Sequence, residues 1–325
     1  MKKVLIVAVF AVALAMISPG AFAQEDKFPS KPINAIVPFA AGGSTDLLAR
    51  AIEKVWPKYS SQPFVVINKP GGGGVTGTEG VVRSKPDGYT IYLGYGSGHD
   101  MVMPHLQKLP YDTFKDLVPV ARLSIHSIVI VTGAASPFKT LPEMIAWAKK
   151  ENKPLTAAVS TRAGSVDITL TSLGKAAGIN IVTVPFAGGA EAVTALAGGH
   201  LTIGGGHPSE VITHIKAGRF RALAVATPER DPALPDLPTM KEGGVNIANW
   251  GSIKGIAAPA GTPPAAIAYY EATLKKVFDD PEFKKMMADL YQPLQYQNAA
   301  DFGRFLKEAS ADYAKLIKDL NITLK

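Results

Sequence analysis

The sequence predicts an α/β protein with two lobes, each built on a mainly parallel sheet flanked by helices. Strand-like and helix-like segments alternate along nearly the whole chain, a pattern typical of parallel sheets covered by helices. The chain has 325 residues, 47% of them hydrophobic, which is ample for a core and favours two lobes over one. Glycine-rich or small-residue turns follow several predicted strands in both halves of the chain. Because ligands of open parallel sheets bind beyond the carboxyl ends of the strands, these turns predict a ligand cleft between the lobes.

Residues 1–23 are expected to form a secretory signal peptide. Two lysines precede an apolar stretch over residues 4–17, and the segment closes on an Ala-Phe-Ala cleavage site. No later stretch reaches the roughly 18 consecutive apolar residues that a membrane-spanning helix needs. We therefore expect a mature chain that begins near Gln24 and acts in the periplasm.

The composition excludes several classes of function. The chain has no cysteine, which rules out disulfides, thiol catalysis and cysteine-ligated metal sites. The formal net charge of +7 is dispersed, without the clustered basic and aromatic residues of a nucleic-acid site.

The histidines show no i, i+4 pair, and the P-loop, zinc-protease and G-x-S-x-G signatures are absent. Residues 72–77 match G-x-G-x-x-G formally, but they do not follow a strand directly, and a structural loop is favoured. We expect no cofactor, no metal and no nucleic-acid partner.

The first predicted strand, residues 33–37, leads into a turn that we expect to bind an anion. The strand is short, apolar and β-branched, and two glycines at residues 42–43 end it. Residues 44–46 are favourable N-cap types, and apolar residues then recur at helical spacing up to residue 55. A helix N-terminus with unpaired N–H groups binds anions without a lysine or arginine. An ordinary strand–helix turn, with Asp46 as a helix cap, is the alternative that this segment leaves open.

The remaining elements repeat this alternation, and a helical C-terminus is expected to pack on the first lobe. Further strands are predicted at residues 64–67, 90–94, 128–131, 155–159, 181–184, 201–203, 223–226 and 250–258. Further helices are predicted at residues 76–84, 141–149, 166–177, from about 190, 209–217, 265–278, 281–290 and 299–319. Residues 204–207 are expected to form a turn between a strand and a helix.

The turns after these strands carry the candidate binding side chains. Ser97 and His99 lie in one glycine-rich turn, and His207 lies in another. A partly exposed loop position is the alternative for both histidines. Arg162 lies in a third turn, where a contact with a ligand carboxylate competes with simple solvation.

Four motifs together resemble the Bug-type (TctC) substrate-binding receptors of tripartite tricarboxylate transporters. They are PFAAGGSTD at residues 38–46, NKPGGGG at 68–74, PDGYT at 86–90 and VPFAGGA at 184–190. The similarity runs from about Phe28 to the C-terminus. It implies a type II periplasmic binding-protein fold with crossovers near Ser124 and Ser252. Lobe I would then comprise residues 24–123 and 252–325, and lobe II residues 124–251.

The resemblance also implies a ligand carboxylate held by backbone amides of the first turn, with the other turns closing over it. The residues that we expect at the ligand are Phe39, Ala40, Ala41, Gly42, Gly43, Ser44, Thr45, Asp46, Ser97, His99, Arg162, Gly164, Ser165, Phe186, Ala187, Gly188, Gly189 and His207. The chain departs from the family pattern where Asp167 stands near the position of a frequent histidine, and at the glycines before His207.

The expected function is a receptor, and not an enzyme, that captures a small carboxylate for the membrane permease subunits of such a transporter. We expect a monomer and a dicarboxylate ligand, whose distal acid would be bound by Arg162 or His207. The ligand-binding subunit of a sensor is a second possibility with the same binding chemistry. A cleft hydrolase is a third, but Ser97 and His99 lack a convincing acid partner in the sequence.

Overall fold

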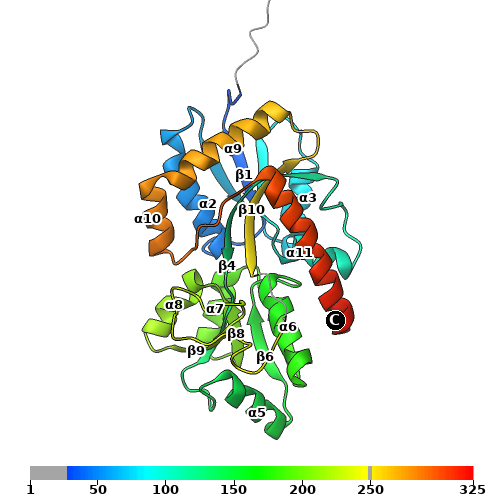
Figure 1. Ribbon diagram of the computed structural model, residues 1–325, viewed down its shortest axis with the longest axis vertical. Coiled ribbons are helices and arrows are strands. Elements are labelled where there is room, and N and C mark those ends of the chain that lie inside the picture. Colours follow the sequence, from blue (N-terminus) through cyan, green and yellow to red (C-terminus); the bar gives the residue numbers. More distant parts are fainter. Residues whose placement is uncertain (1–27, 248–250, 325) are drawn as a thin grey trace, which may run out of the picture.

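The computed structural model describes residues 28–247 and 251–324, and these form two lobes stacked along the long axis of the molecule (Figure 1). The predicted signal peptide lies outside the described residues. Lobe I contains a six-stranded sheet with the strand order β11-β4-β10-β3-β1-β2, and lobe II a five-stranded sheet with the order β7-β6-β8-β5-β9. Helices flank both sheets, so the predicted two-lobed α/β class is confirmed.

Each sheet is mixed. In lobe I, β1 pairs in parallel with β2 and β3, whereas β10 pairs antiparallel with β3 and β4. In lobe II, β6 pairs in parallel with β7 and β8, whereas β5 is antiparallel to β8 and β9. Residues that follow the carboxyl ends of the parallel-paired strands β1, β3, β6, β7 and β8 line the cavity between the lobes.

The strands are β1 (Ile33–Val37), β2 (Phe64–Asn68), β3 (Thr90–Tyr95), β4 (Leu117–His126), β5 (Val129–Gly133), β6 (Leu155–Val159), β7 (Ile181–Pro185), β8 (Ile203–Gly206), β9 (Phe220–Val225), β10 (Ser252–Pro259) and β11 (Gln297–Asn298). The helices are α2 (Ser44–Val55), α3 (Val75–Val82), α4 (Gly98–Met101), α5 (Leu141–Glu151), α6 (Ser165–Ala177), α7 (Gly189–Ala197), α8 (Pro208–Lys216), α9 (Pro264–Asp279), α10 (Pro281–Asp289) and α11 (Ala299–Asp319). Short 3₁₀ turns lie at η1 (Trp56–Lys58), η2 (Gly72–Gly74) and η3 (Met103–His105).

Strands β4 and β10 connect the lobes. They pair along their whole length, with Ser252 opposite His126 and Pro259 opposite Leu117. The chain passes from the end of β4 into β5 of lobe II, and it returns to lobe I at the start of β10. Strand β4 was not predicted from the sequence, although it is mostly buried and lies between β11 and β10 in its sheet.

The glycines at residues 204–206 do not form the expected turn but belong to β8, in the middle of the lobe II sheet. A Cβ atom on Gly205 would lie 2.5 Å from Val166 Cγ1, and one on Gly206 would lie 2.7 Å from Val211 Cγ1. These contacts are shorter than any that side chains normally make, so the glycines let helices α6 and α8 approach the sheet closely. The prediction of a turn was wrong because it treated glycine only as a turn residue.

The C-terminal helices α9, α10 and α11 pack on lobe I, as expected (Figure 1). Phe302, Leu306 and Tyr313 of α11 are buried together with residues of β3 and β10. None of the helices among the described residues is long and apolar enough to cross a membrane.

Candidate functional site

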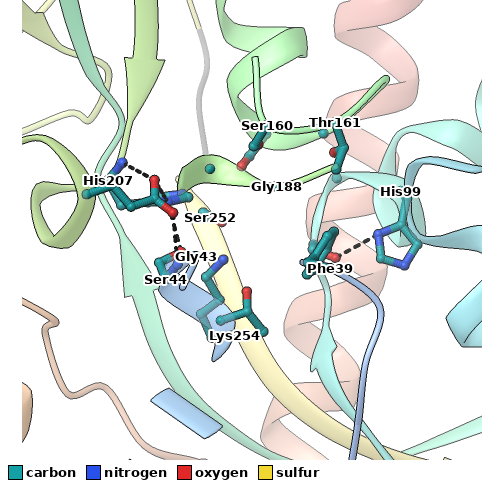
Figure 2. A pocket seen from close by; sticks show the side chains of 17 residues that line it. Phe39, Gly43, Ser44, His99, Ser160, Thr161, Gly188, His207, Ser252 and Lys254 are labelled. Atoms are coloured by element: carbon teal, nitrogen blue, oxygen red, sulfur yellow. Dashed lines mark hydrogen bonds and ion pairs between the residues drawn. The ribbon is translucent and has the colours of Figure 1, made fainter. Parts of the chain in front are cut away.

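A small cavity lies between the lobes, where turns from both sheets converge (Figure 2). Its volume is about 30 Å³. It is lined by Phe39, Gly43, Ser44, Thr45, Ser97, Gly98, His99, Ser160, Thr161, Gly164, Ser165, Gly188, Gly189, His207, Glu210, Ser252 and Lys254. The N-termini of α2, α6 and α7 all border the cavity. Backbone N–H groups from both lobes are therefore directed into it.

The turns around the cavity share one local construction. An acidic residue at the third position of the helix accepts a hydrogen bond from an amide in the turn that precedes it. The pairs are Gly42 N to Asp46 Oδ2 at 2.9 Å, Gly96 N to Asp100 Oδ2 at 2.9 Å, Ala163 N to Asp167 Oδ2 at 2.6 Å, Ala187 N to Glu191 Oε2 at 3.2 Å and His207 N to Glu210 Oε2 at 3.0 Å. These carboxylates fix the turns and keep the first helical amides directed at the cavity. Asp167, where the family resemblance suggested a histidine, has this positioning role.

The turns after β1 and β7 carry similar sequences and contact each other across the cleft. Ala40 N donates to Ala187 O over 3.1 Å, so backbone of lobe I is bonded to backbone of lobe II. A Cβ atom on Gly188 would lie 3.2 Å from that of Ala40, so the two loops pack closely here. The lobes are therefore closed upon each other in this conformation.

Glu210 of α8 is bonded to the N-terminus of α2 in the other lobe. Ser44 N donates to Glu210 Oε1 over 2.8 Å, and His207 Nδ1 lies 2.9 Å from both Glu210 Oε2 and Ser44 Oγ (Figure 2). Although burial opposes ionisation, the contacts with His207 and the amide of Ser44 lower the pKa of Glu210. Burial also lowers the pKa of His207, despite the neighbouring Glu210. We infer an ionised Glu210 beside an uncharged imidazole at neutral pH.

Lys254 of β10 projects its ammonium group toward the cavity (Figure 2). The residue is only 3% exposed, and among the described residues its ammonium group forms no hydrogen bond or ion pair. Burial lowers the pKa of Lys254 to about 8, an effect that the charge of Glu210 partly offsets. A buried cation of this kind is stabilised by a bound anion, which makes Lys254 the best candidate for a carboxylate contact.

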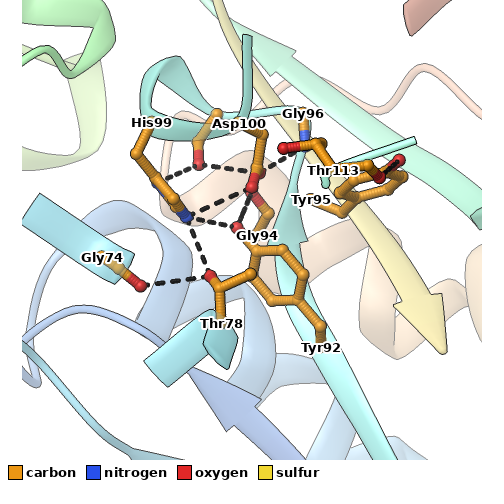
Figure 3. Close-up of polar contacts among 10 residues, drawn as sticks. Gly74, Thr78, Tyr92, Gly94, Tyr95, Gly96, His99, Asp100 and Thr113 are labelled. Atoms are coloured by element: carbon orange, nitrogen blue, oxygen red, sulfur yellow. Dashed lines mark hydrogen bonds and ion pairs between the residues drawn. The ribbon is translucent and has the colours of Figure 1, made fainter. Parts of the chain in front are cut away.

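His99 is held inside lobe I by a network of side chains (Figure 3). Its Nε2 atom lies 3.0 Å from Thr78 Oγ1 and 2.9 Å from the Tyr92 hydroxyl, and its Nδ1 atom lies 3.0 Å from Ser97 Oγ. Burial lowers the pKa of His99 to about 3. An imidazole with so low a pKa is a poor general base at neutral pH, so the Ser97–His99 pair lacks what a hydrolase needs.

Burial raises the pKa of Asp100 to about 7, although the Tyr92 hydroxyl donates to it over 2.7 Å. Asp100 lies behind His99 and does not line the cavity. The network thus stabilises the turn and presents the imidazole as an uncharged wall of the site.

The structure brings together most of the residues that the sequence singled out. Those that line the cavity are Phe39, Gly43, Ser44, Thr45, Ser97, His99, Gly164, Ser165, Gly188, Gly189 and His207. The others expected at the ligand (Ala40, Ala41, Gly42, Asp46, Arg162, Phe186 and Ala187) do not line it. Ala40, Gly42, Asp46 and Ala187 form the hydrogen bonds that hold the turns in place.

Arg162 lines a second cavity, of about 280 Å³, between α6, β7 and the C-terminal residues. Asp167 also lines this second cavity. The predicted ligand contact of Arg162 therefore stays a prediction, without the geometric proximity that His207 has.

Lys254 and Glu210 are the charged residues of the site that sequence reasoning missed. For each of these residues, the local sequence contains a feature that could have identified it. Lys254 is a lone charge in an otherwise uncharged strand, and Glu210 stands at the third position of a helix that follows a candidate ligand residue.

The structure resembles solved solute-binding proteins over most of its length. The periplasmic binding protein BugD superposes with a TM-score of 0.86 at 30% identity, covering 92% of this chain and all of that one. MatC of Rhodopseudomonas palustris, solved with bound malate, gives a TM-score of 0.83 at 26% identity and covers 89% of this chain and all of that one. Together with the cavity between the lobes, these similarities define the class: the chain is a solute-binding protein.

The family is also established. The family model of the tripartite tricarboxylate transporter family receptor matches residues 48–322. A protein of Cupriavidus necator, described as a UPF0065 protein in the gbd 5' region, is 31% identical over 97% of this chain and 95% of its own length. The chain belongs to the TctC family of tripartite tricarboxylate transporter receptors, as the four sequence motifs predicted.

Proposed function

We propose that this protein captures a small carboxylate in the periplasm and delivers it to the permease subunits of a tripartite tricarboxylate transporter. The observation that carries the proposal is Lys254, a buried cation that faces the cavity between the lobes and has no ion-pair partner among the described residues. Family membership supports the transporter role. The malate bound to MatC supports a carboxylate ligand.

The ligand carboxylate would bind to the Lys254 ammonium group and to helical amides at the cavity. A carboxylate bonded to a lysine is a charge-assisted contact, and helix N-termini add donors that cost no side-chain ordering. A hydrogen bond to a charged group contributes about 1.5–3 kcal/mol. A few such contacts in a closed, desolvated cleft reach the roughly 8 kcal/mol that corresponds to micromolar affinity.

Ligand binding would require the lobes to open. A cavity of about 30 Å³ accommodates roughly one or two water molecules and not a carboxylate of the size of malate. We propose that lobe I (residues 24–123 and 252–325) and lobe II (residues 124–251) separate at the crossovers near Ser124 and Ser252 and close again around the ligand. Small-angle scattering tests this: ligand should shift the protein toward a more compact state, and an unchanged radius of gyration at saturation would refute closure.

The central experiment is a binding panel. Calorimetry on ligand-free protein, titrated with mono-, di- and tricarboxylates and with amino acids, should show saturable binding of at least one small carboxylate. Lys254→Met should weaken that binding by about 10–100-fold, because it removes one charge-assisted contact. Lys307→Met, at an exposed position of α11, is the matched control and should bind like the natural protein. The absence of heat across the whole panel would refute the proposed function.

Three further parts of the proposal have their own tests. Cleavage of the signal peptide predicts a periplasmic form that begins near Gln24, measurable as intact mass. A monomer predicts a scattering mass of one chain with and without ligand. Co-purification with membrane permease subunits would distinguish the transporter receptor from the ligand-binding subunit of a sensor.

A further inference from the structure

Glu210 differs from the other acidic residues that hold the turns around the cavity. Asp46, Asp100, Asp167 and Glu191 each accept a hydrogen bond from the turn that precedes their own helix. Glu210 does the same through Oε2, but its Oε1 atom accepts from Ser44 N of the opposite lobe, 166 residues away.

The Glu210 carboxylate lies where the N-termini of α2 and α7 meet. A Cβ atom built on Gly43 would lie 3.6 Å from its Oε1 atom, and one on Gly189 would lie only 2.2 Å away. The bare Cα of Gly189 is therefore what leaves room for the carboxylate. The place at which two helix N-termini would receive an anion is already filled by an anion of the chain itself.

The charges that remain for a ligand are few. Among the described residues that line the cavity, the histidines are uncharged at neutral pH, which leaves Lys254 as the cation and Glu210 as the anion. A first carboxylate can pair with Lys254. Because Lys254 and Glu210 line the same cavity, a second carboxylate would lie near Glu210 once the lobes close around the ligand, and like charges at short range in a desolvated cavity repel strongly.

From this arrangement we propose that Glu210 is a specificity-determining residue, which restricts the cleft to ligands with one carboxylate and an uncharged or cationic second end. The inference rests on the proposed carboxylate-binding function and narrows its substrate class. It replaces the dicarboxylate that the sequence led us to expect. The ligand carboxylate pairs with Lys254, and the second end lies beside Glu210 and the hydroxyl groups of the cavity wall.

The test compares dicarboxylates with their monoamides, which have nearly the same shape but one charge less. The probes are succinate, glutarate and adipate, each against succinamate, glutaramate and adipamate, with affinities measured by calorimetry. The natural protein should bind the monoamide of the best-fitting length at least tenfold more tightly than the corresponding dicarboxylate. Equal affinity, or a preference for the dicarboxylate, would overturn the inference.

Two variants isolate the role of the charge. Glu210→Gln should shift the ratio of the two affinities toward the dicarboxylate by about 10–100-fold, while Glu308→Gln, at an exposed position of α11, should leave the ratio unchanged. Thermal unfolding establishes that each variant is folded. A folded Glu210→Gln protein with an unaltered ratio would overturn the inference, as would a natural protein without the monoamide preference.

The binding measurements would give a different result if the proposed function itself were wrong. If no probe and no other carboxylate binds to the natural protein, the carboxylate receptor itself is refuted, and the specificity inference falls with it. If carboxylates bind without regard to Glu210, the receptor stands and only the inference is lost.

Discussion

The turns that follow β1 and β7 have nearly the same sequence, yet they have different roles at the cleft. Both begin Val-Pro-Phe-Ala and both have two consecutive glycines at the start of a helix, with an acidic residue at the third helical position. They differ at the first helical position, which is Ser44 in lobe I and Gly189 in lobe II. The backbone amide of Ser44 donates a hydrogen bond to the Glu210 carboxylate. Gly189, because it has no side chain, leaves room for the same carboxylate.

The two turns also differ in burial. Asp46 is 5% exposed and lies beneath the first turn, whereas Glu191 is an exposed residue. The comparison shows that a shared local motif fixes the backbone of a turn, and that the contacts across the cleft decide what the turn then binds.

The largest expected effect comes from replacing Asp46, and the equivalent replacement of Glu191 in lobe II serves as the comparison. Asp46 accepts hydrogen bonds from Gly42 N, from Asn68 Nδ2 at 2.9 Å and from Arg50 Nε at 3.4 Å. Asp46→Asn keeps one acceptor oxygen and directs an amide group at these donors, which should cost about 2–3 kcal/mol of the free energy of unfolding. Glu191→Gln, at an exposed site, should cost less than about 0.5 kcal/mol. Chemical denaturation measures both, and equal losses would show that burial does not distinguish the two turns.

Gly189→Ala should have the next largest effect. The added Cβ would overlap the Glu210 carboxylate, so either the carboxylate or the turn must move, at a cost of about 1–3 kcal/mol. Gly80→Ala is the matched control, since no atom other than its chain neighbours and the backbone of α3 lies within 4 Å of its Cβ position. Thermal unfolding should show a lowered midpoint for the first variant and an unchanged or raised midpoint for the second. A stable Gly189→Ala protein would contradict the close packing of the two turns around Glu210.

The pH dependence of ligand binding distinguishes a ligand contact with Lys254 from contacts with the backbone amides of the turns, because backbone amides do not titrate. The pKa of Lys254 is lowered to about 8, and a carboxylate binds the protonated form. Affinity should therefore be nearly constant between about pH 6.5 and pH 7.5, where the ligand carboxylate is ionised, and should fall about tenfold for each pH unit above about pH 8, until the pKa of the complex is reached. Calorimetry in buffers with different ionisation enthalpies should also show proton uptake at pH 9. Affinity that stays constant to pH 10 would assign the ligand carboxylate to the amides alone.

Apart from the control substitutions, Ser44→Ala should have the smallest effect. It removes the contact between Ser44 Oγ and His207 Nδ1 but keeps the amide that donates to Glu210. The loss of one hydrogen bond between neutral groups costs about 1 kcal/mol of the free energy of unfolding. The cost is not larger, because His207 Nδ1 keeps Glu210 as a partner and is not left without a hydrogen bond. A loss as large as that of Gly189→Ala would mean that the hydroxyl group, and not the amide, holds the lobes together. Unfolding curves recorded side by side provide the comparison.

The first turn could be predicted from sequence because its determinants are local. A β-branched strand, two glycines and a row of N-cap residues specify a strand, a turn and a helix within a short segment. The same reasoning located most predicted helices to within a residue or two, and the family motifs predicted the fold and the receptor class. The long strand β4 was missed because Pro119 near its start argues against a strand, although residues 122–126 alternate between polar and apolar side chains, which is a strand pattern.

The sequence by itself determined the alternating elements, the family and the turns whose backbone amides line the cleft. Only the tertiary structure decided that Glu210 meets Ser44 across the lobes, that Lys254 faces the cavity, and that Arg162 lines a different one. The physical reason is that local patterns fix backbone conformation over one or two turns of chain. The contacts of a charged side chain with residues of another lobe depend on how the two sheets pack against each other, and local sequence patterns do not reveal that packing.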